Sequence, residues 1–122
     1  MNAAGEAPPA FRRGAVWWAE LPDAAGSGPG FRRPVVVVSA DAFNASRIET
    51  VVVVVLTSNL RLADAPGNVR VRPKEAGLPT ESVANVSQVL TVDKDVLTAR
   101  AGQLRPATLE QVAAGLRLAL DL

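Results

Sequence analysis

Arg33 is the residue in this chain best placed to act on a charged group, because Pro34 follows it and fixes where its side chain starts. A guanidinium offers five N–H donors in a planar fork and stays charged at any workable pH. It suits a phosphate, and still better the extra negative charge of a phosphorane-like transition state. The alternative is an ordinary strand-end arginine in solvent. The glycine-rich segment before it and the valines after it favour a phosphate-handling site.

Thr57, Ser58 and Asn59 form a second polar group, which ends a run of unbroken valines. Two hydroxyls and an amide at a strand end can bind a phosphate oxygen or orient a neighbouring arginine. They also end strands and cap helices for purely local reasons. The functional interpretation requires the two valine strands to be neighbours, so that Thr57 lies near Arg33. A cation and a hydroxyl brought together in this way would suit the cleavage of RNA.

The segment between these strands contains Gly26-Ser27-Gly28-Pro29-Gly30. It is not a nucleotide-binding P-loop, because no Gly-Lys-Ser/Thr follows, and it precedes a strand rather than opening a helix. A loop as long as residues 22–32 is more often functional than idle in a small domain. We expect a flexible lid, with a slack connector as the alternative.

Weaker candidates lie on other predicted strands. Arg70 and Arg72 alternate with valines and could track a phosphate backbone, although a solvated edge strand would show the same pattern. Of Trp17 and Trp18, one should fill the core and the other, on the face of Glu20, could stack a base; the alternative is a core role for both.

The composition excludes several classes of protein. The 122 residues include no histidine and no cysteine, which removes Ser-His and Cys-His nucleophile pairs, disulfides and thiol ligands. The lack of cysteine suits a reducing cytoplasm. No apolar run approaches the roughly 20 residues needed to span a bilayer. A net charge of +1 does not by itself indicate a nucleic-acid binder, and the excess of arginine over lysine is also typical of a GC-rich genome.

Hydrophobic periodicity predicts one domain, residues 13–122, after a disordered tail, residues 1–12. The class is mainly β with α: a small, strongly bent antiparallel sheet or barrel with a C-terminal amphipathic helix. That helix should start at a Thr108–Gln111 capping box and bury Leu109, Val112, Ala113 and Leu116. The two valine runs should be central, and a homodimer would help to cover them; the alternative is a monomer with an efficient core. We expect strands at 14–21, 34–39, 50–56, 67–73, 82–91 and 100–104, helical turns at 41–46 and 93–97, and a loop at 60–66.

An ordered set of motifs resembles the MazF/PemK/Kid family of bacterial toxins. The set spans nearly the whole predicted domain and comprises Arg13-Gly14-Ala-Val-Trp, Gly26-Ser27, Arg33-Pro34-Val-Val-Val-Val-Ser39, Asp41-Ala-Phe-Asn44, Val55-Leu-Thr57-Ser58-Asn59, Gly77-Leu-Pro, Ser82-Val83, Gln88 and Thr91-Val-Asp-Lys94. The resemblance implies an SH3-like barrel, a homodimer and a cognate antitoxin. It also implies cleavage of single-stranded RNA at a specific short sequence without metal or cofactor, leaving a 2′,3′-cyclic phosphate and a 5′-hydroxyl.

Carried over by position, the family's catalytic arginine and threonine are Arg33 and Thr57, the residues already singled out. We expect supporting or RNA-binding roles for Ser27, Arg32, Ser58, Asn59, Arg70, Arg72 and Gln88, and candidates for the general base are Glu20 and water. The chain departs from the family where Gly28-Pro29 replaces Glu-Gln, where Ser87 replaces an acidic residue, and where Asn85 replaces an arginine found in some members. A non-cleaving module that binds RNA or antitoxin on the same fold is therefore the alternative function.

Overall fold

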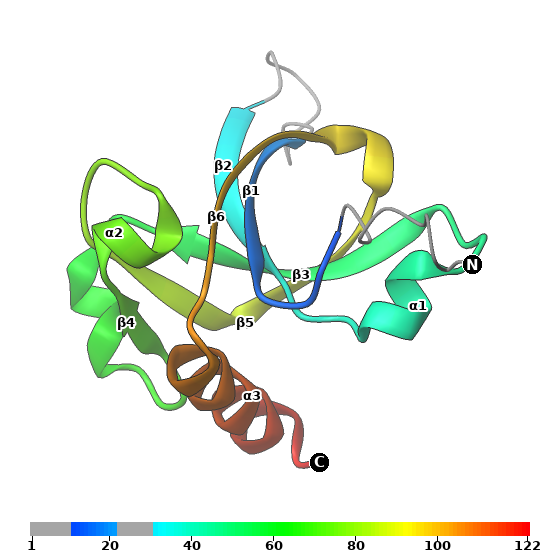
Figure 1. Ribbon diagram of the computed structural model, residues 1–122. Helices are drawn as coiled ribbons and strands as arrows, with labels where there is room; N and C mark the ends of the chain where they lie inside the picture. The colour runs from blue at the N-terminus through cyan, green and yellow to red at the C-terminus, as the bar shows by residue number, and fades with distance from the viewer. Residues whose placement is uncertain (1–10, 22–30) are drawn as a thin grey trace.

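The computed structural model describes residues 11–21 and 31–122, and the predicted tail up to residue 10 and the loop from 22 to 30 lie outside these residues. The strands form a single antiparallel sheet in the order β4-β5-β3-β2-β1-β6, curled into a half-barrel with a C-terminal helix against it (Figure 1). The strands are β1 (Ala15–Leu21), β2 (Phe31–Val37), β3 (Thr50–Thr57), β4 (Val69–Val71), β5 (Ser82–Asp93) and β6 (Leu97–Gln103). The mainly β class with a C-terminal helix is confirmed.

The two valine runs are central, as predicted. β2 and β3 lie side by side in the middle of the sheet, and Val35, Val36, Val53 and Val54 have no exposed surface. Successive side chains alternate between two hydrophobic cores, because neighbouring residues of a strand point to opposite faces. Both faces of these strands are covered within one chain, so the valines need no second copy to bury them.

The first core contains Val36, Val54 and Leu56, and Val112 of the C-terminal helix packs into it. The second contains Val35, Val53 and Val55. Trp18 packs against the first core and Trp17 against the second, which confirms the predicted division of the first strand into two faces.

Five short helices complete the described chain: α1 (Asp41–Ala45), η1 (Leu60–Asp64), α2 (Pro73–Ala76), η2 (Lys94–Val96) and α3 (Pro106–Leu120), of which η1 and η2 are 3₁₀ helices. The predicted buried face of α3 is confirmed, since Val112 and Ala113 are buried and Leu109 and Leu116 pack against the first core.

The predicted capping box of α3 is wrong. The helix begins at Pro106, its N-cap residue is Arg105, and Thr108 lies inside the helix with a buried side chain. Proline fits this first position because the N–H it lacks would have no partner inside the helix. The backbone N–H of the N-cap residue, Arg105, instead donates a hydrogen bond of 2.7 Å to the side chain of Glu75, which lies on α2.

Other boundaries also differ from the prediction. β2 starts at Phe31, so both arginines before Pro34 belong to the strand rather than to the loop. Residues 60–64 form η1 rather than a loop, and the strand predicted for 67–73 is limited to β4, followed at once by α2. Proline at position 73 starts a helix well and extends a strand poorly, which explains the change.

The folded part of the chain already includes Phe11. Its ring lies 5.0 Å from that of Trp17, and its carbonyl oxygen accepts a hydrogen bond of 2.8 Å from Asn44. Within the described residues, no helix has the length and apolar character that crossing a bilayer requires.

Candidate active site

The register of the two central strands brings Arg33 and Thr57 together. Val35 of β2 pairs with Val55 of β3, and continuing this antiparallel register by two residues sets Arg33 opposite Thr57. Both residues line one cleft of about 480 Å³. The remaining residues of this cleft, which we call the arginine cleft, are Trp18, Arg32, Pro34, Leu56, Ser58, Asn59, Leu78, Pro79, Thr80 and Ser82.

Arg33 starts from a rigid backbone. Pro34 pairs with Trp18 across β1 and β2, and Arg33 itself pairs with Ala19, so the strand holds the Cα of the arginine in place. Its guanidinium carbon lies 5.3 Å from the centre of the Phe31 ring. This cation–π contact orients the side chain while leaving N–H donors for a ligand.

Thr57 is largely buried, with 9% of its surface exposed. Its hydroxyl oxygen accepts a hydrogen bond of 3.1 Å from the backbone N–H of Asn59. Asn59 in turn caps η1 by accepting from the backbone N–H of Arg61. Because the threonine oxygen acts as an acceptor toward Asn59, its own O–H remains able to donate to a group in the cleft.

Arg32 and Glu20 form an ion pair on paired positions of β2 and β1. Their side chains approach to 3.1 Å and are each about half exposed, so solvent screens the pair. The guanidinium of Arg32 also lies over the ring of Trp18 at 4.6 Å. The carboxylate of Glu20 is thus paired with Arg32, the residue before Arg33. Its role as a general base stays a prediction.

A second cleft, of about 360 Å³, shares Arg33 with the first. Its walls are mostly apolar, and the amide of Gln88 is one of its few polar groups; we call it the glutamine cleft. The residues around it are Leu21, Phe31, Arg33, Val55, Gln88, Leu90, Thr91 and Val92. Arg33 thus lies where a polar cleft and an apolar cleft meet.

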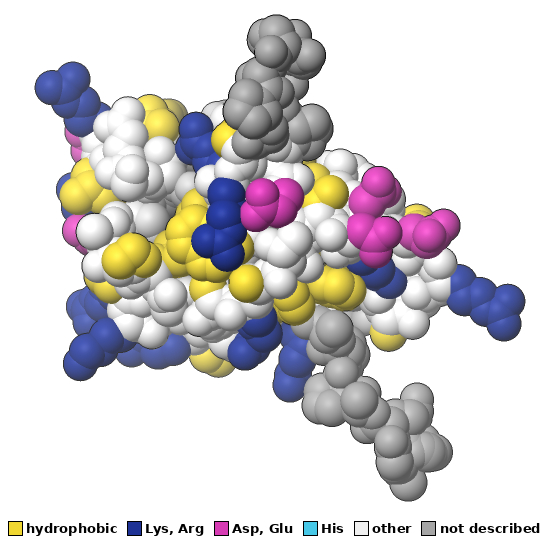
Figure 2. Space-filling model, turned by 90° about the horizontal axis from the view of Figure 1, so that it is seen from above, with side chains coloured by type: hydrophobic (Ala, Val, Ile, Leu, Met, Phe, Trp, Pro, Cys, Tyr) yellow, Lys and Arg dark blue, Asp and Glu magenta, His cyan; other side chains and the backbone are white. Residues whose placement is uncertain are grey.

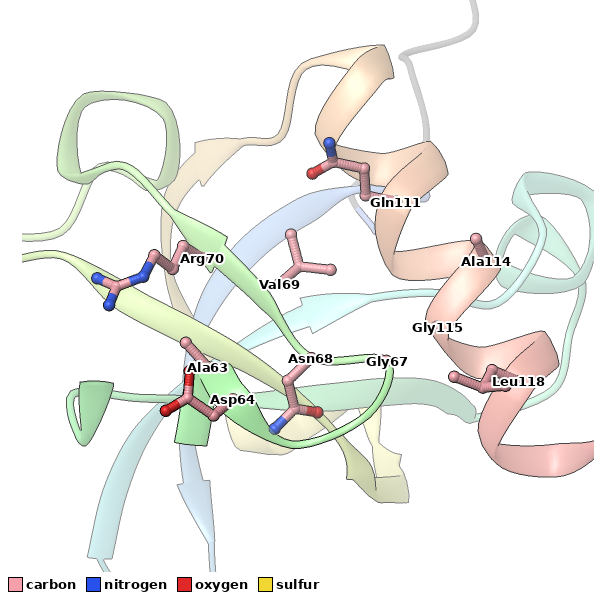
Figure 3. Close-up of a pocket in the computed structure, with 10 residues that line it drawn as sticks. All are labelled: Ala63, Asp64, Gly67, Asn68, Val69, Arg70, Gln111, Ala114, Gly115 and Leu118. Atoms are coloured by element: carbon pink, nitrogen blue, oxygen red, sulfur yellow. The ribbon is translucent and has the colours of Figure 1, made fainter. Parts of the chain in front are cut away.

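The structure does not place Arg70 or Arg72 in either cleft that contains Arg33. Arg70 lies on the edge strand β4, pairs with Glu81 at 3.2 Å and lines a different groove beside α3 (Figure 3). Arg72 falls outside β4 at the exposed N-cap of α2, so the prediction that it shares a strand face with Arg70 is wrong. Ser27 lies outside the described residues.

Sequence analysis missed Ser82 as a site residue. It lines the arginine cleft, its side chain is 3% exposed, and its hydroxyl makes no hydrogen bond to any residue that the structure describes. A buried polar atom without a partner is uncommon, and a ligand can supply the missing partner. The only sequence signal was a serine at the start of a strand, which is too common to indicate a site.

Basic and apolar side chains share one face of the described part of the molecule. Figure 2 shows a face on which apolar patches lie among Lys and Arg side chains, with several acidic side chains toward one end and another near the centre beside a basic side chain. No group of three or more His, Cys, Asp or Glu residues among those described is arranged to hold a metal ion.

The chain is thus a small, mainly β domain: a curled half-barrel with a C-terminal helix, in which Arg32 and Arg33 line a cleft together with residues from the end of β3. Comparison with known proteins shows which family it belongs to. The chain belongs to the PemK-like, MazF-like toxins of type II toxin–antitoxin systems, whose family model matches residues 12–120. The resemblance found in the sequence is therefore confirmed.

Named relatives and a solved structure agree with this family. The chain is 44% identical over 110 residues to endoribonuclease MazF2 of Mycobacterium bovis, covering 90% of this chain and 96% of the relative. It is 32% identical over 111 residues to endoribonuclease EndoA of Bacillus subtilis, covering 91% and 95%. A mycobacterial endoribonuclease solved in complex with its cognate antitoxin superposes with a TM-score of 0.72 at 31% identity, covering 91% of this chain and 95% of that one.

Proposed function

We propose that this chain is the toxin of a toxin–antitoxin pair and an endoribonuclease that cleaves single-stranded RNA at a specific short sequence. Its relatives are named endoribonucleases, and the family is one of toxins. The observation that carries the proposal is that Arg33 and Thr57 line a single cleft. The scissile phosphate would bind between them.

In the proposed reaction, the 2′-hydroxyl oxygen of the substrate attacks the adjacent phosphorus. A bond forms from phosphorus to O2′, the bond to O5′ breaks, the 2′-proton passes to a base, and the leaving oxygen takes up a proton. The products are a 2′,3′-cyclic phosphate and a 5′-hydroxyl. Holding the nucleophile in line with the leaving group accounts for much of the acceleration that such enzymes achieve.

Arg33 would bind the non-bridging oxygens and stabilise the charge that develops on them. Arginine is a poor base, because a guanidinium stays protonated at any workable pH, so we assign the 2′-proton to another group. The Thr57 hydroxyl would donate to a phosphate oxygen, which its acceptor role toward Asn59 permits. Glu20, beside Arg32, and water are the candidate bases.

The test is cleavage of a mixed-sequence RNA in EDTA by the wild type, Arg33→Ala and Thr57→Ala. Losing one donor to a developing oxyanion costs about 100- to 1,000-fold in rate, so we expect losses of that size. Arg47→Ala is the matched control, because Arg47 is exposed and precedes β3 at the end opposite Thr57. Full activity in both cleft variants would refute the assignment, and cleavage only after Mg²⁺ is added would refute the metal-free mechanism.

The proposal includes two protein partners in the cytoplasm, a cognate antitoxin and a second copy of this chain. The dimer rests on family membership and on exposed apolar side chains such as Leu118, which is 64% exposed. Light scattering should give twice the chain mass, and co-expression with the antitoxin should relieve growth arrest. A monomer at micromolar concentration would contradict the dimer.

A non-cleaving module that binds RNA or antitoxin is the second candidate. The residues described around the glutamine cleft include no carboxylate, and Ser87 and Asn85 are the positions where the resemblance to the family leads us to expect a charged residue in many or some members. Growth arrest without any newly formed RNA ends would favour this second function over the first.

A further inference from the structure

Three carboxamide side chains form a continuous hydrogen-bonded chain that ends at the glutamine cleft. Asn68 donates to Asn85 at 3.2 Å, and Asn85 donates to Gln88 at 3.0 Å. Ser87 adds a hydrogen bond of 2.8 Å to the side-chain oxygen of Asn85. The first residue follows the turn at Gly67, and the other two lie on β5, so the chain links two elements.

The direction of this chain is fixed by backbone groups whose identity is unambiguous. The backbone N–H of Val86 donates to Asn68 at 2.9 Å, so the side-chain atom of Asn68 that faces it must be the oxygen. The amide nitrogen of Asn68 then faces the carbonyl oxygen of Leu62 at 2.8 Å, as an N–H donor should. The same nitrogen also faces Asn85, which must therefore present its oxygen there.

This polarity passes through Asn85 to Gln88. The side-chain oxygen of Asn85 accepts from Asn68 and Ser87, so the group of Asn85 that faces Gln88 is its amide nitrogen. Because that nitrogen donates, Gln88 must accept with its side-chain oxygen. Gln88 is left with two N–H groups for a ligand. A glutamine without such a partner could rotate its amide by half a turn to meet either a donor or an acceptor. The hydrogen bond from Asn85 instead keeps the oxygen of Gln88 on Asn85 and its N–H groups toward the ligand.

A β-bulge creates the arrangement. Val54 of β3 pairs with Val89 of β5, whereas the next residue, Val55, pairs with Asn85, so the intervening residues of β5 bulge out of the ladder. The bulge turns Gln88 toward the cleft that contains Arg33, while Asn85 stays 9% exposed beneath it. Bulges commonly re-aim a side chain at a binding site in this way.

The glutamine cleft has the chemistry of a nucleobase pocket. Its walls are mostly apolar, Phe31 is 39% exposed, and Arg33, the proposed phosphate ligand, is shared with the neighbouring cleft. A flat base next to the bound phosphate could stack on the ring of Phe31. The N–H donors of Gln88 would then meet the group at pyrimidine C4 or purine C6, where they pair with the carbonyl oxygen of uracil or guanine and not with the amino group of cytosine or adenine.

We propose that Asn85 is a positioning residue that fixes Gln88 as a hydrogen-bond donor, so that the glutamine cleft selects a base with a carbonyl group at pyrimidine C4 or purine C6, uracil or guanine, over one with an amino group at that position, cytosine or adenine. This inference rests on the proposed function, because it assumes that RNA occupies the two clefts. It assigns base selection to Asn85, a residue that does not line the glutamine cleft and acts on it through Gln88.

Asn85→Asp tests the proposal because it changes one atom type and keeps the shape. The aspartate would still accept from Asn68 and Ser87, but its second oxygen would repel the oxygen of Gln88. Gln88 would then reverse, donate to Asp at position 85 and present its oxygen to the cleft. Gln88→Glu, at an exposed position that tolerates substitution, presents an acceptor directly and tests the same idea if the first variant folds poorly.

The measurement is the binding of 2′-O-methyl oligouridylate and oligocytidylate of equal length, followed by fluorescence anisotropy. These strands cannot undergo attack by the 2′-oxygen, and they differ at the edge that Gln88 would contact. We expect the wild type to prefer oligouridylate by about 3- to 10-fold, the value of one hydrogen bond, and both variants to prefer oligocytidylate. Ser87→Ala, which removes one bond to Asn85 without altering polarity, should keep the wild-type preference.

An equal affinity of the wild type for both strands, or a preference for uridylate retained in both variants, would overturn the inference. If the wild type nevertheless cleaves RNA and needs Arg33 to do so, the proposed function is supported and only the proposed base selection is refuted. If the wild type cleaves no RNA but the reversal is seen, the base selection stands and the chain is the non-cleaving module.

Discussion

Replacing Gly115 of α3 by alanine should destabilise the protein, although alanine is the better helix former. An added Cβ would lie 2.0 Å from the carbonyl oxygen of Gly67 and 3.1 Å from a methyl group of Val86. Figure 3 shows Gly115 facing the turn that carries Gly67. The obstacle is backbone, and Gly67 itself has a φ of +82°, so no side-chain rotation can relieve the clash.

The magnitude follows from two opposing terms. Alanine gains about 1 kcal/mol over glycine in a helix interior. Ordinary contact begins near 3.4 Å, so α3 or the turn must move by more than 1 Å, which separates Val112 from the first core. Overpacking of this kind costs about 3 kcal/mol at the upper end of its usual range. The expected net loss in the free energy of unfolding is therefore about 2 kcal/mol.

Urea denaturation followed by tryptophan fluorescence measures this loss. The matched control is Ala114→Gly, at the exposed neighbouring position, where only helix propensity changes and about 1 kcal/mol is lost. Gly115→Ala should be the less stable of the two variants. A Gly115→Ala protein at least as stable as the wild type would refute the close contact between α3 and the Gly67 turn.

Two further predictions concern buried polar groups. Glu75→Ala should lower the free energy of unfolding by about 1–3 kcal/mol, because the Glu75 side chain is 5% exposed and accepts a hydrogen bond from the backbone N–H of Arg105 at the start of α3. Arg105→Ala should lower it by less than about 1 kcal/mol, because the Arg105 side chain is 65% exposed. Equal losses in urea denaturation would show that the ion pair, rather than the bond to the backbone, matters. Ser82→Ala should raise the free energy of unfolding by about 1 kcal/mol, because it removes a buried hydroxyl without a partner among the described residues; a loss of similar size in the same assay would contradict this.

Much of the fold could be predicted because it is encoded locally. Alternation along residues 14–21 predicted which of Trp17 and Trp18 belongs to each face, and unbroken valine predicted the two central strands. The spacing of Leu109, Val112 and Leu116 predicted the buried face of α3. Each of these signals depends only on the spacing of apolar residues within one helix or strand. That spacing puts the apolar side chains on one face, and burying this face stabilises the fold wherever the element packs.

The errors arose where a local rule competed with a distant partner. The threonine and glutamine of the supposed capping box obey a local pattern, but Glu75 supplies an acceptor from another helix and the helix starts earlier, at Pro106. The strand predicted through residue 73 stops at Val71 because Pro73 starts α2 instead.

The sequence by itself determined most of the strands, the C-terminal helix, the central position of the valine strands and the identity of Arg33 and Thr57 as the candidates for chemistry, because residue type and spacing act over a few neighbours. Only the tertiary structure decided that Ser82 joins them, that Arg70 faces another groove, and that Asn68 sets the polarity of Gln88 through Asn85. Most of these contacts join residues far apart in the chain, and Asn85 reaches Gln88, three residues away, only because β5 bulges between them. They depend on strand register and on one bulge, and no local pattern in the chain specifies either.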